Sequence, residues 1–126
     1  MRNRDGCVHN QEALRHFLEV ERARAARHGC PILVVVIGVR PSGQRLSTDV
    51  ATGIFFGLGK GLREVDVIGW LREERIAGAV LTAGTRRPTP EDSRTIARRV
   101  QNILRECIPS GVADHVKVRV IQVQPD

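Results

Sequence analysis

The stretch that decides the fold lies at the centre of the chain and reads Arg63-Glu-Val-Asp-Val-Ile-Gly-Trp-Leu-Arg-Glu-Glu-Arg-Ile-Ala-Gly-Ala-Val-Leu-Thr82. Two apolar runs, residues 67–71 and 76–81, flank the charged link Arg72-Glu73-Glu74-Arg75. Short apolar runs joined by a short polar link predict a β-hairpin. Four charges at its tip are typical either of a solvated loop or of a former site.

Two further strands are predicted on either side of this hairpin. Residues 32–39 form an almost unbroken run of branched apolar residues between Pro31 and Pro41, which is typical of a strand buried on both faces. Near the end of the chain, residues 116–123 begin with strict alternation, Val-Lys-Val-Arg-Val. Alternation predicts one buried and one wet face, so we expect this strand at an edge of the sheet.

Three helices are predicted from their end signals. The first begins after Asn10 and runs to about residue 28. The second begins at Ser47 or Thr48 and runs to about residue 63, with glycines inside it that favour close approach to the sheet. The third has Thr89 as its N-cap and begins at Pro90, followed by a one-sided apolar stripe. Residues 40–47 and 83–87 are predicted loops.

The predicted order α-β-α-β-β-α-β indicates a mixed α/β (α+β) domain. Its βαββαβ part is the ferredoxin-like pattern, with an antiparallel-containing sheet and an extra N-terminal helix. In that topology the first and third strands are central and the second and fourth lie at the edges. We expect residues 1–126 to form one domain, with a flexible N-terminus at residues 1–9.

Composition and net charge bear on which partners, metals and cellular compartment to expect. The chain has 126 residues, a net charge of +6 and only 3% aromatic residues. The basic balance raises the question of nucleic acid or an anionic membrane as partner. The arginines are scattered and few aromatics accompany them, which favours a solvated basic surface over a polyanion-binding face. Three cysteines without metal-ligand spacing fit unpaired thiols in a reducing cytoplasm. The histidines show no metal spacing, so no metal or cofactor is expected.

The layout resembles that of GGDEF domains, the nucleotidyl-cyclase-like fold of diguanylate cyclases. The resemblance rests on a first helix with Glu-Val-Glu-Arg-Ala-Arg-Ala-Ala-Arg-His-Gly, on Pro31 before an apolar strand, and on a helix ending in Leu62-Arg63-x-x-Asp66. A hairpin beginning Val-Ile-Gly, a Pro-Glu-Asp helix and a Val-x-Val-x-Val strand complete it. The chain ends after its fourth strand, where the family usually adds a further hairpin and helix.

Two departures from the family indicate lost catalysis. The resemblance implies a Gly-Gly-Asp-Glu-Phe turn whose glycines admit GTP and whose acids bind metal, but this chain has Arg72, Glu73, Glu74, Arg75 and Ile76 there. Full side chains in place of the glycines would block that approach. The family's first-strand Asp-x-Asp metal positions are Gly38 and Arg40 here. Without oxygen ligands such a site would not hold Mg²⁺.

One family feature is retained. Arg63 and Asp66 precede the turn at the spacing of the family's inhibitory Arg-x-x-Asp motif, which binds the product cyclic di-GMP. Arg can grip phosphate or a guanine edge, and Asp can accept hydrogen bonds from guanine. The alternative is that the two residues form a local ion pair or helix-end cap.

The sequence therefore predicts a catalytically inactive GGDEF-like domain with a regulatory, signalling or protein-interaction role in the bacterial cytoplasm. It would act as a homodimer or beside other domains of a signalling chain, without membrane insertion. One alternative is a cyclic di-GMP receptor that uses Arg63 and Asp66. A second, less favoured, is a basic ferredoxin-like module that binds nucleic acid. Trp70, beside the turn, is expected to be a packing residue.

Overall fold

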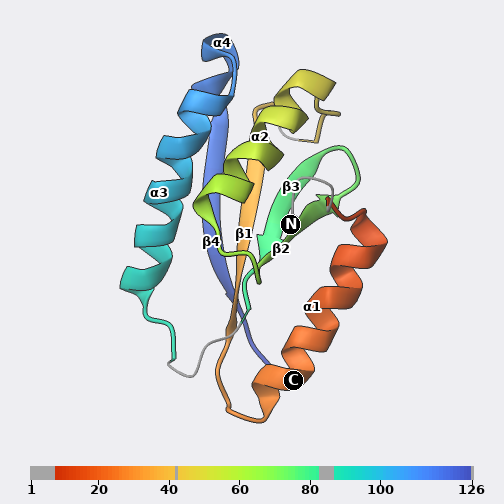
Figure 1. Cartoon of the computed structure of the whole chain (residues 1–126), viewed down its shortest axis with the longest axis vertical. Helices are drawn as coiled ribbons and strands as arrows, with labels where there is room; N and C mark the ends of the chain where they lie inside the picture. The colour runs from red at the N-terminus through yellow and green to blue at the C-terminus, as the bar shows by residue number, and fades with distance from the viewer. Residues whose placement is uncertain (1–7, 42, 83–86, 126) are drawn as a thin grey trace.

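The computed structural model of the protein describes residues 8–41, 43–82 and 87–125. Figure 1 shows its elements, which are α1 Gln11–Ala26, β1 Ile32–Val39, α2 Thr48–Gly61, β2 Val67–Arg72, β3 Ile76–Val80, α3 Pro90–Cys107, α4 Ser110–Ala113 and β4 Val116–Val123. The predicted element order is confirmed, apart from the short helix α4, which the sequence did not indicate. The predicted loop at residues 83–87 lies outside the described residues except for Arg87.

The strands form a four-stranded sheet in the order β2-β3-β1-β4, and every neighbouring pair is antiparallel. The first and third strands are central and the second and fourth are at the edges, as the ferredoxin-like pattern predicts. β1 pairs along its whole length with β4, from Ile32 opposite Val123 to Val39 opposite Val116. The mixed α/β fold with an antiparallel sheet is confirmed.

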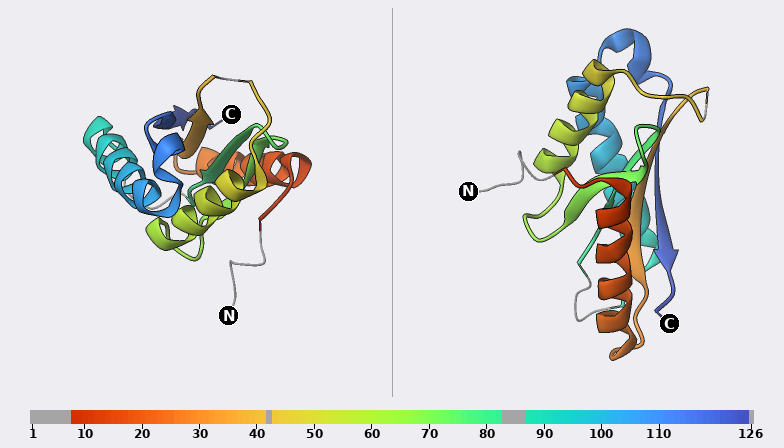
Figure 2. Two further views of the ribbon diagram at one scale, coloured as in Figure 1. Left: turned by 90° about the horizontal axis from the view of Figure 1, so that it is seen from above. Right: turned by 90° about the vertical axis from the view of Figure 1, so that its right-hand side faces the viewer.

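Helices cover both faces of the sheet, because alternate residues of each strand point to opposite sides. The larger core contains Val35, Ile37 and Ala79 with Ile54 and Leu104 from α2 and α3. The smaller core lies under α1 on the other face and contains Leu14, Ala25, Ile32 and Val80. Figures 1 and 2 show α2 and α3 side by side and α1 along the hairpin.

The glycines of α2 allow close contact with α3, not with the sheet as the sequence suggested. A Cβ added at Gly53 would overlap the backbone carbonyl of Cys107, and one added at Gly57 would lie 2.6 Å from Leu104 Cδ2. The two glycines are one helical turn apart, so they share one face of α2. The unfavourable helix propensity of these glycines is therefore offset by tight packing between two helices.

The predicted helix starts are confirmed. Asn10 accepts a hydrogen bond from the Ala13 amide at 2.8 Å and caps α1. Thr89 and Asp92 form a reciprocal capping box at the start of α3, because Asp92 reaches back despite its shorter side chain. Ser47 caps α2, so this helix begins at Thr48.

The N-terminal segment differs from the prediction where it is described. Residues 1–7 lie outside the described residues, so their predicted flexibility stays a prediction. His9, however, forms a parallel bridge with Gly69 on the outer edge of β2. Its amide donates to the Ile68 carbonyl at 3.1 Å, and its carbonyl accepts from the Trp70 amide at 2.9 Å. Gly69 permits this approach, because a Cβ there would overlap the His9 backbone.

Two further sequence expectations concern cysteines and membranes. Cys30 is a buried free thiol and Cys107 a half-buried one, whereas Cys7 lies outside the described residues. Among the helices of the described residues, none combines the length and the apolar character that a membrane crossing requires.

Candidate functional site

The tip of the β2–β3 hairpin is the turn between Arg72 and Ile76, where the resemblance to GGDEF domains implies their signature motif. Its first acid, Glu73, is tied to the start of α1 by a reciprocal pair of hydrogen bonds. The Gln11 amide donates to Glu73 Oε1 at 2.8 Å, and the Glu73 amide donates to Gln11 Oε1 at 2.7 Å. A carboxylate beside the first amides of a helix is stabilised by the helix dipole. Glu73 therefore has a structural role in joining the hairpin to α1.

Glu74 and Arg75 hold the loop that follows β1. Glu74 forms an ion pair with Arg45, with 2.7 Å between Nε and Oε1, and its carbonyl accepts from the Leu46 amide at 2.8 Å. Arg75 donates from Nη1 to the Gly43 carbonyl. Glu74 also has a positive φ of 62°, a conformation that favours glycine over a side chain. The tip is therefore fastened to the protein on two sides and is not a free solvated loop.

The residues at the family's metal positions provide no carboxylate. Gly38 lies near the end of β1 opposite Lys117, and Arg40 follows the strand, with its amide bonded to the His115 carbonyl at 3.0 Å. Within the described residues, no three His, Cys, Asp or Glu side chains gather closely enough to bind a metal ion. Gly38 and Arg40 themselves therefore offer no side-chain oxygen to a divalent cation.

A cavity of about 600 Å³ lies between the tip and α2. Its wall is largely apolar and includes Phe55, Phe56 and Trp70. Trp70 packs edge-to-face on Phe55 with ring centroids 5.0 Å apart, which is the packing role that the sequence predicted. The charged residues among its described lining are Glu73 and Glu74. Two carboxylates without a lining cation make this cavity unfavourable for a polyphosphate.

The base of the same hairpin contains the Arg-x-x-Asp pair, Arg63 and Asp66. The Asp66 side chain is only 2% exposed and accepts three hydrogen bonds, from the Arg63 amide at 2.9 Å, the Thr82 amide at 3.0 Å and Arg63 Nη2 at 3.3 Å. Thr82 also donates from its hydroxyl to the Val65 carbonyl at 2.7 Å. Asp66 therefore joins the turn before β2 to the end of β3. Its bonds to Arg63 are the local ion pair and cap that the sequence offered as the alternative to ligand binding.

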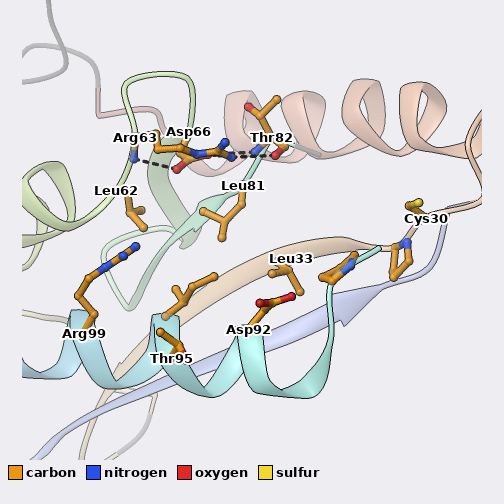
Figure 3. A pocket seen from close by; sticks show the side chains of 13 residues that line it. Cys30, Leu33, Leu62, Arg63, Asp66, Leu81, Thr82, Asp92, Thr95 and Arg99 are labelled. Atoms are coloured by element: carbon orange, nitrogen blue, oxygen red, sulfur yellow. Dashed lines mark hydrogen bonds and ion pairs between the residues drawn. The ribbon is translucent and has the colours of Figure 1, made fainter. Parts of the chain in front are cut away.

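Arg63 lies beside Asp66 but is much more exposed. Its side chain is 63% exposed, and Nη2 donates to the Thr82 carbonyl at 3.0 Å as well as to Asp66. A cavity of about 410 Å³ adjoins it, between the base of the hairpin and the first half of α3. Figure 3 shows Asp92, Thr95 and Arg99 on α3 facing this space across from Arg63. The base thus combines a buried carboxylate with arginines at the rim of a cavity.

The structure does not bring the two predicted sites together. β2 separates Asp66 from the tip, and a strand of this length spans roughly 20 Å. The tip and the base are therefore independent sites at opposite ends of one hairpin.

The fold was compared with known proteins. None of the protein-family models matches the sequence. No curated protein matches it either. Solved structures do match. The diguanylate cyclase SiaD from Pseudomonas aeruginosa, solved in complex with its activator SiaC, superposes with a TM-score of 0.62 at 21% identity. That match covers 90% of this chain and 45% of the SiaD chain, so this chain spans less than half of SiaD.

A second match is a DGC protein from Thermotoga maritima, with a TM-score of 0.66 and 13% identity, over 95% of this chain and 83% of the other. The chain has the diguanylate cyclase fold. At these identities the likeness concerns the fold, and the resemblance in layout inferred from the sequence is confirmed at that level.

Within the diguanylate cyclase fold, the contacts that define the two ends come partly from residues that the sequence did not single out. Gln11, Arg45 and Arg99 belong to elements distant in sequence from the hairpin tip and the Arg-x-x-Asp pair. Gln11 had one signal, its place directly after the N-cap of α1. Arg45 and Arg99 lack a local signal, because only tertiary packing brings Arg45 to the tip and Arg99 of α3 to the cavity beside Arg63. Thr82 directly follows β3, and the pairing of β2 with β3 places it beside Asp66.

Proposed function

We propose that this chain is a catalytically inactive GGDEF-like domain with a regulatory or protein-interaction role. The observation that carries the proposal is the hairpin tip, where the side chains of Glu73, Glu74 and Arg75 bond to other parts of the protein. Glu73 joins α1, while Glu74 and Arg75 join the loop after β1. A turn that serves catalysis needs its backbone and acids free for the nucleotide and its metal.

The surroundings of the tip support the same proposal. Gly38 and Arg40 place no carboxylate where metal-assisted phosphoryl transfer would need one. The adjoining cavity is lined by aromatic side chains and by the carboxylates of Glu73 and Glu74, and its described lining offers no cationic side chain to the phosphates of GTP.

A role in protein interaction is supported by a solved complex of another protein with this fold. SiaD was solved in complex with its activator SiaC, so a protein with this fold takes part in a protein–protein complex. We infer that this chain acts through a partner of that kind, through a second copy of itself or through other domains of a signalling chain.

The test is synthesis of cyclic di-GMP from GTP and Mg²⁺ by the purified chain, followed by chromatography, with an active diguanylate cyclase assayed in parallel. We expect no product above the level formed in the absence of protein. Product formation that depends on protein concentration would overturn the proposal.

A second candidate, reception of cyclic di-GMP, is favoured by the base of the hairpin. Arg63 is mostly exposed at the rim of the 410 Å³ cavity, and Arg99 lines the same cavity. Two guanidinium groups fit the two phosphates of a cyclic dinucleotide. Asp66 would position Arg63 and would not contact the ligand, because its carboxylate already accepts three hydrogen bonds.

Titration calorimetry with cyclic di-GMP tests this candidate. If the base binds the ligand, Arg63→Ala should weaken binding at least about tenfold, since a charge-assisted hydrogen bond contributes roughly 1.5–3 kcal/mol. Arg72→Ala, at the far end of β2, is the matched control and should bind like the unchanged protein. No heat of binding, or binding that Arg63→Ala leaves intact, would contradict the candidate.

A further inference from the structure

The outer edge of β4 has backbone groups that pair with no other described strand. β4 is the last strand of the sheet and pairs only with β1 among the described strands. At its start the side chain of Gln101 in α3 bonds this edge. Gln101 Nε2 donates to the Val116 carbonyl at 3.1 Å, and its Oε1 accepts from the Val118 amide at 3.2 Å. Just past the other end of β4, Arg22 Nε donates to the Gln124 carbonyl at 3.2 Å. The edge is therefore open between Val118 and Gln124, with a side-chain contact at each end.

The Gln101 contacts also identify which backbone groups face outward. In an antiparallel pair, the amide and carbonyl of alternate residues point away from the partner strand. Since Val116 and Val118 point away from β1, the amides and carbonyls of Val120 and Gln122 do so too. These groups have no hydrogen-bond partner within the described residues. Beyond the blocked start, the edge can therefore accept another strand.

Positive side chains lie on both sides of β4: Arg98 and Arg119 are nearer the open part of the edge, whereas Arg105 and Lys117 lie beside its blocked start. Arg98 and Arg105 are exposed and lie three residues before and four after Gln101, so they share its face of α3. Lys117 and Arg119 are exposed on the opposite face of β4. None of these four cations forms an ion pair within the described residues. An added strand would thus meet positive charge on both of its faces.

From this charge complementarity we propose that the open edge of β4 binds an extended acidic peptide segment of a partner protein, which adds as a fifth strand. The backbone groups of Val120 and Gln122 would pair with the peptide backbone, and acidic side chains on its two faces would meet the two pairs of cations. The inference gives a partner class to the interaction role proposed above and rests on that role. It is measured by peptide binding and not by GTP turnover, so each proposal can fail without the other.

Two other occupants fit the edge less well. Symmetric pairing of two β4 edges would bring Lys117 and Arg119 of both copies onto one small surface, which like-charge repulsion disfavours. Nucleic acid would meet the cations, but it would leave the alternating amides and carbonyls of the edge without partners. Single-stranded nucleic acid also binds through aromatic stacking, and the outward faces of this edge carry no aromatic side chain.

The experiment uses nitrogen-15 NMR of the chain with the blocked peptide Ac-Thr-Glu-Glu-Val-Glu-Glu-Val-Thr-NH₂, which has glutamates on both faces of a strand. We expect the amides of Val120 and Gln122 to shift saturably and to exchange more slowly with solvent. The same peptide with lysine in place of each glutamate, or with alternate backbone amides methylated, should leave both amides unchanged. Binding of the lysine or methylated peptide with equal affinity would overturn the proposal.

Variants of the chain distinguish the contribution of the cations to peptide binding from that of backbone pairing along β4. Arg98→Glu and Arg119→Glu should each weaken peptide binding by about two- to fivefold, the range of an exposed ion pair. Lys60→Glu on α2 reverses the same charge away from β4 and should bind like the unchanged protein. Gln101→Ala should extend the site, so that the Val118 amide joins the shifted set. Equal weakening by Lys60→Glu would contradict the proposed location.

The same spectra report the competing occupants. If the amides of Val120 and Gln122 change on dilution without peptide, a second copy occupies the edge and the proposal fails. It also fails if a mixed-sequence single-stranded oligonucleotide binds Lys117 and Arg119 more tightly than the acidic peptide does at the same salt concentration.

Discussion

The two ends of the β2–β3 hairpin carry similar charges but use them differently. At the tip, Glu73, Glu74 and Arg75 all contact neighbouring parts of the protein, namely α1 and the loop after β1. At the base, Asp66 is buried and fully bonded, whereas its partner Arg63 remains 63% exposed beside a cavity. Charged residues in a turn thus indicate a ligand site only when their polar groups are not already used by the fold.

The difference is between charged side chains that bond to other parts of the fold and a charged side chain that is exposed enough to contact a ligand. The tip lies where the resemblance places catalysis, and its contacts make it a joint between elements. The base lies where the resemblance places product binding, and it keeps one cation of the pair accessible. Four sets of variants test this difference between tip and base through the free energy of unfolding.

The largest effect is expected for Asp66→Ala at the base. The substitution leaves the Arg63 and Thr82 amides without their acceptor, and each unsatisfied buried donor costs about 1–3 kcal/mol. We expect a loss of roughly 2–4 kcal/mol in urea denaturation followed by circular dichroism. Asp66→Asn, which keeps one acceptor oxygen, should lose less. A loss below about 1 kcal/mol for Asp66→Ala would show that this carboxylate does not hold the base together.

At the tip, Gln11→Ala and Glu73→Ala should each lower stability by about 1 kcal/mol, the typical size of a helix-cap contribution. The two side chains bond one another's backbone amides. A double-mutant cycle should therefore give a coupling energy above about 0.5 kcal/mol. Additive losses would mean that the hairpin tip and α1 are not joined through this pair.

Arg63→Ala should change stability by less than about 1 kcal/mol, because the guanidinium is mostly exposed and exposed ion pairs contribute little. The comparison with Asp66→Ala is the informative quantity. If Arg63→Ala destabilises the protein as much as Asp66→Ala does, then the arginine is a structural residue and is not available to a ligand.

The smallest effect is expected for the Arg45–Glu74 ion pair, whose side chains are 71% and 48% exposed. Arg45→Ala should cost a few tenths of a kcal/mol at low salt, and the difference should vanish near 1 M salt because of screening. Arg45→Lys, which keeps the charge, serves as the control. A salt-independent loss would point to packing of the Arg45 side chain and not to the ion pair.

Much of the fold could be predicted from local sequence signals. The unbroken apolar run of β1 and the alternation of β4 placed these strands at the centre and the edge, since burial on one or both faces determines the pattern. The caps Asn10 and Thr89 marked helix starts by their own hydrogen bonds. By contrast, the contact of His9 with β2 depends on the missing side chain of Gly69, which leaves room for the His9 backbone. No local sequence signal indicates that these two segments meet.

The candidate site was less predictable for the same reason. The resemblance to GGDEF domains pointed to Arg63, Asp66 and the turn from Arg72 to Ile76, but it could not show which of their charged groups bond to other parts of the fold. The partners of Glu73 and Asp66 lie 62 and 16 residues away in the chain. Only tertiary structure reveals that the charged side chains of the turn bond α1 and the loop after β1, and that Arg63, although bonded to Asp66 and Thr82, is 63% exposed.

The most direct test of the central claim is a nitrogen-15 NMR titration of the chain with GTP and Mg²⁺, observing the amides of Glu73, Glu74 and Arg75. If the tip is held by its own contacts, these amides should keep their positions up to millimolar GTP. Saturable shifts at the tip, with loss of the Gln11–Glu73 hydrogen bonds, would show that the turn opens to bind the nucleotide and would contradict the account.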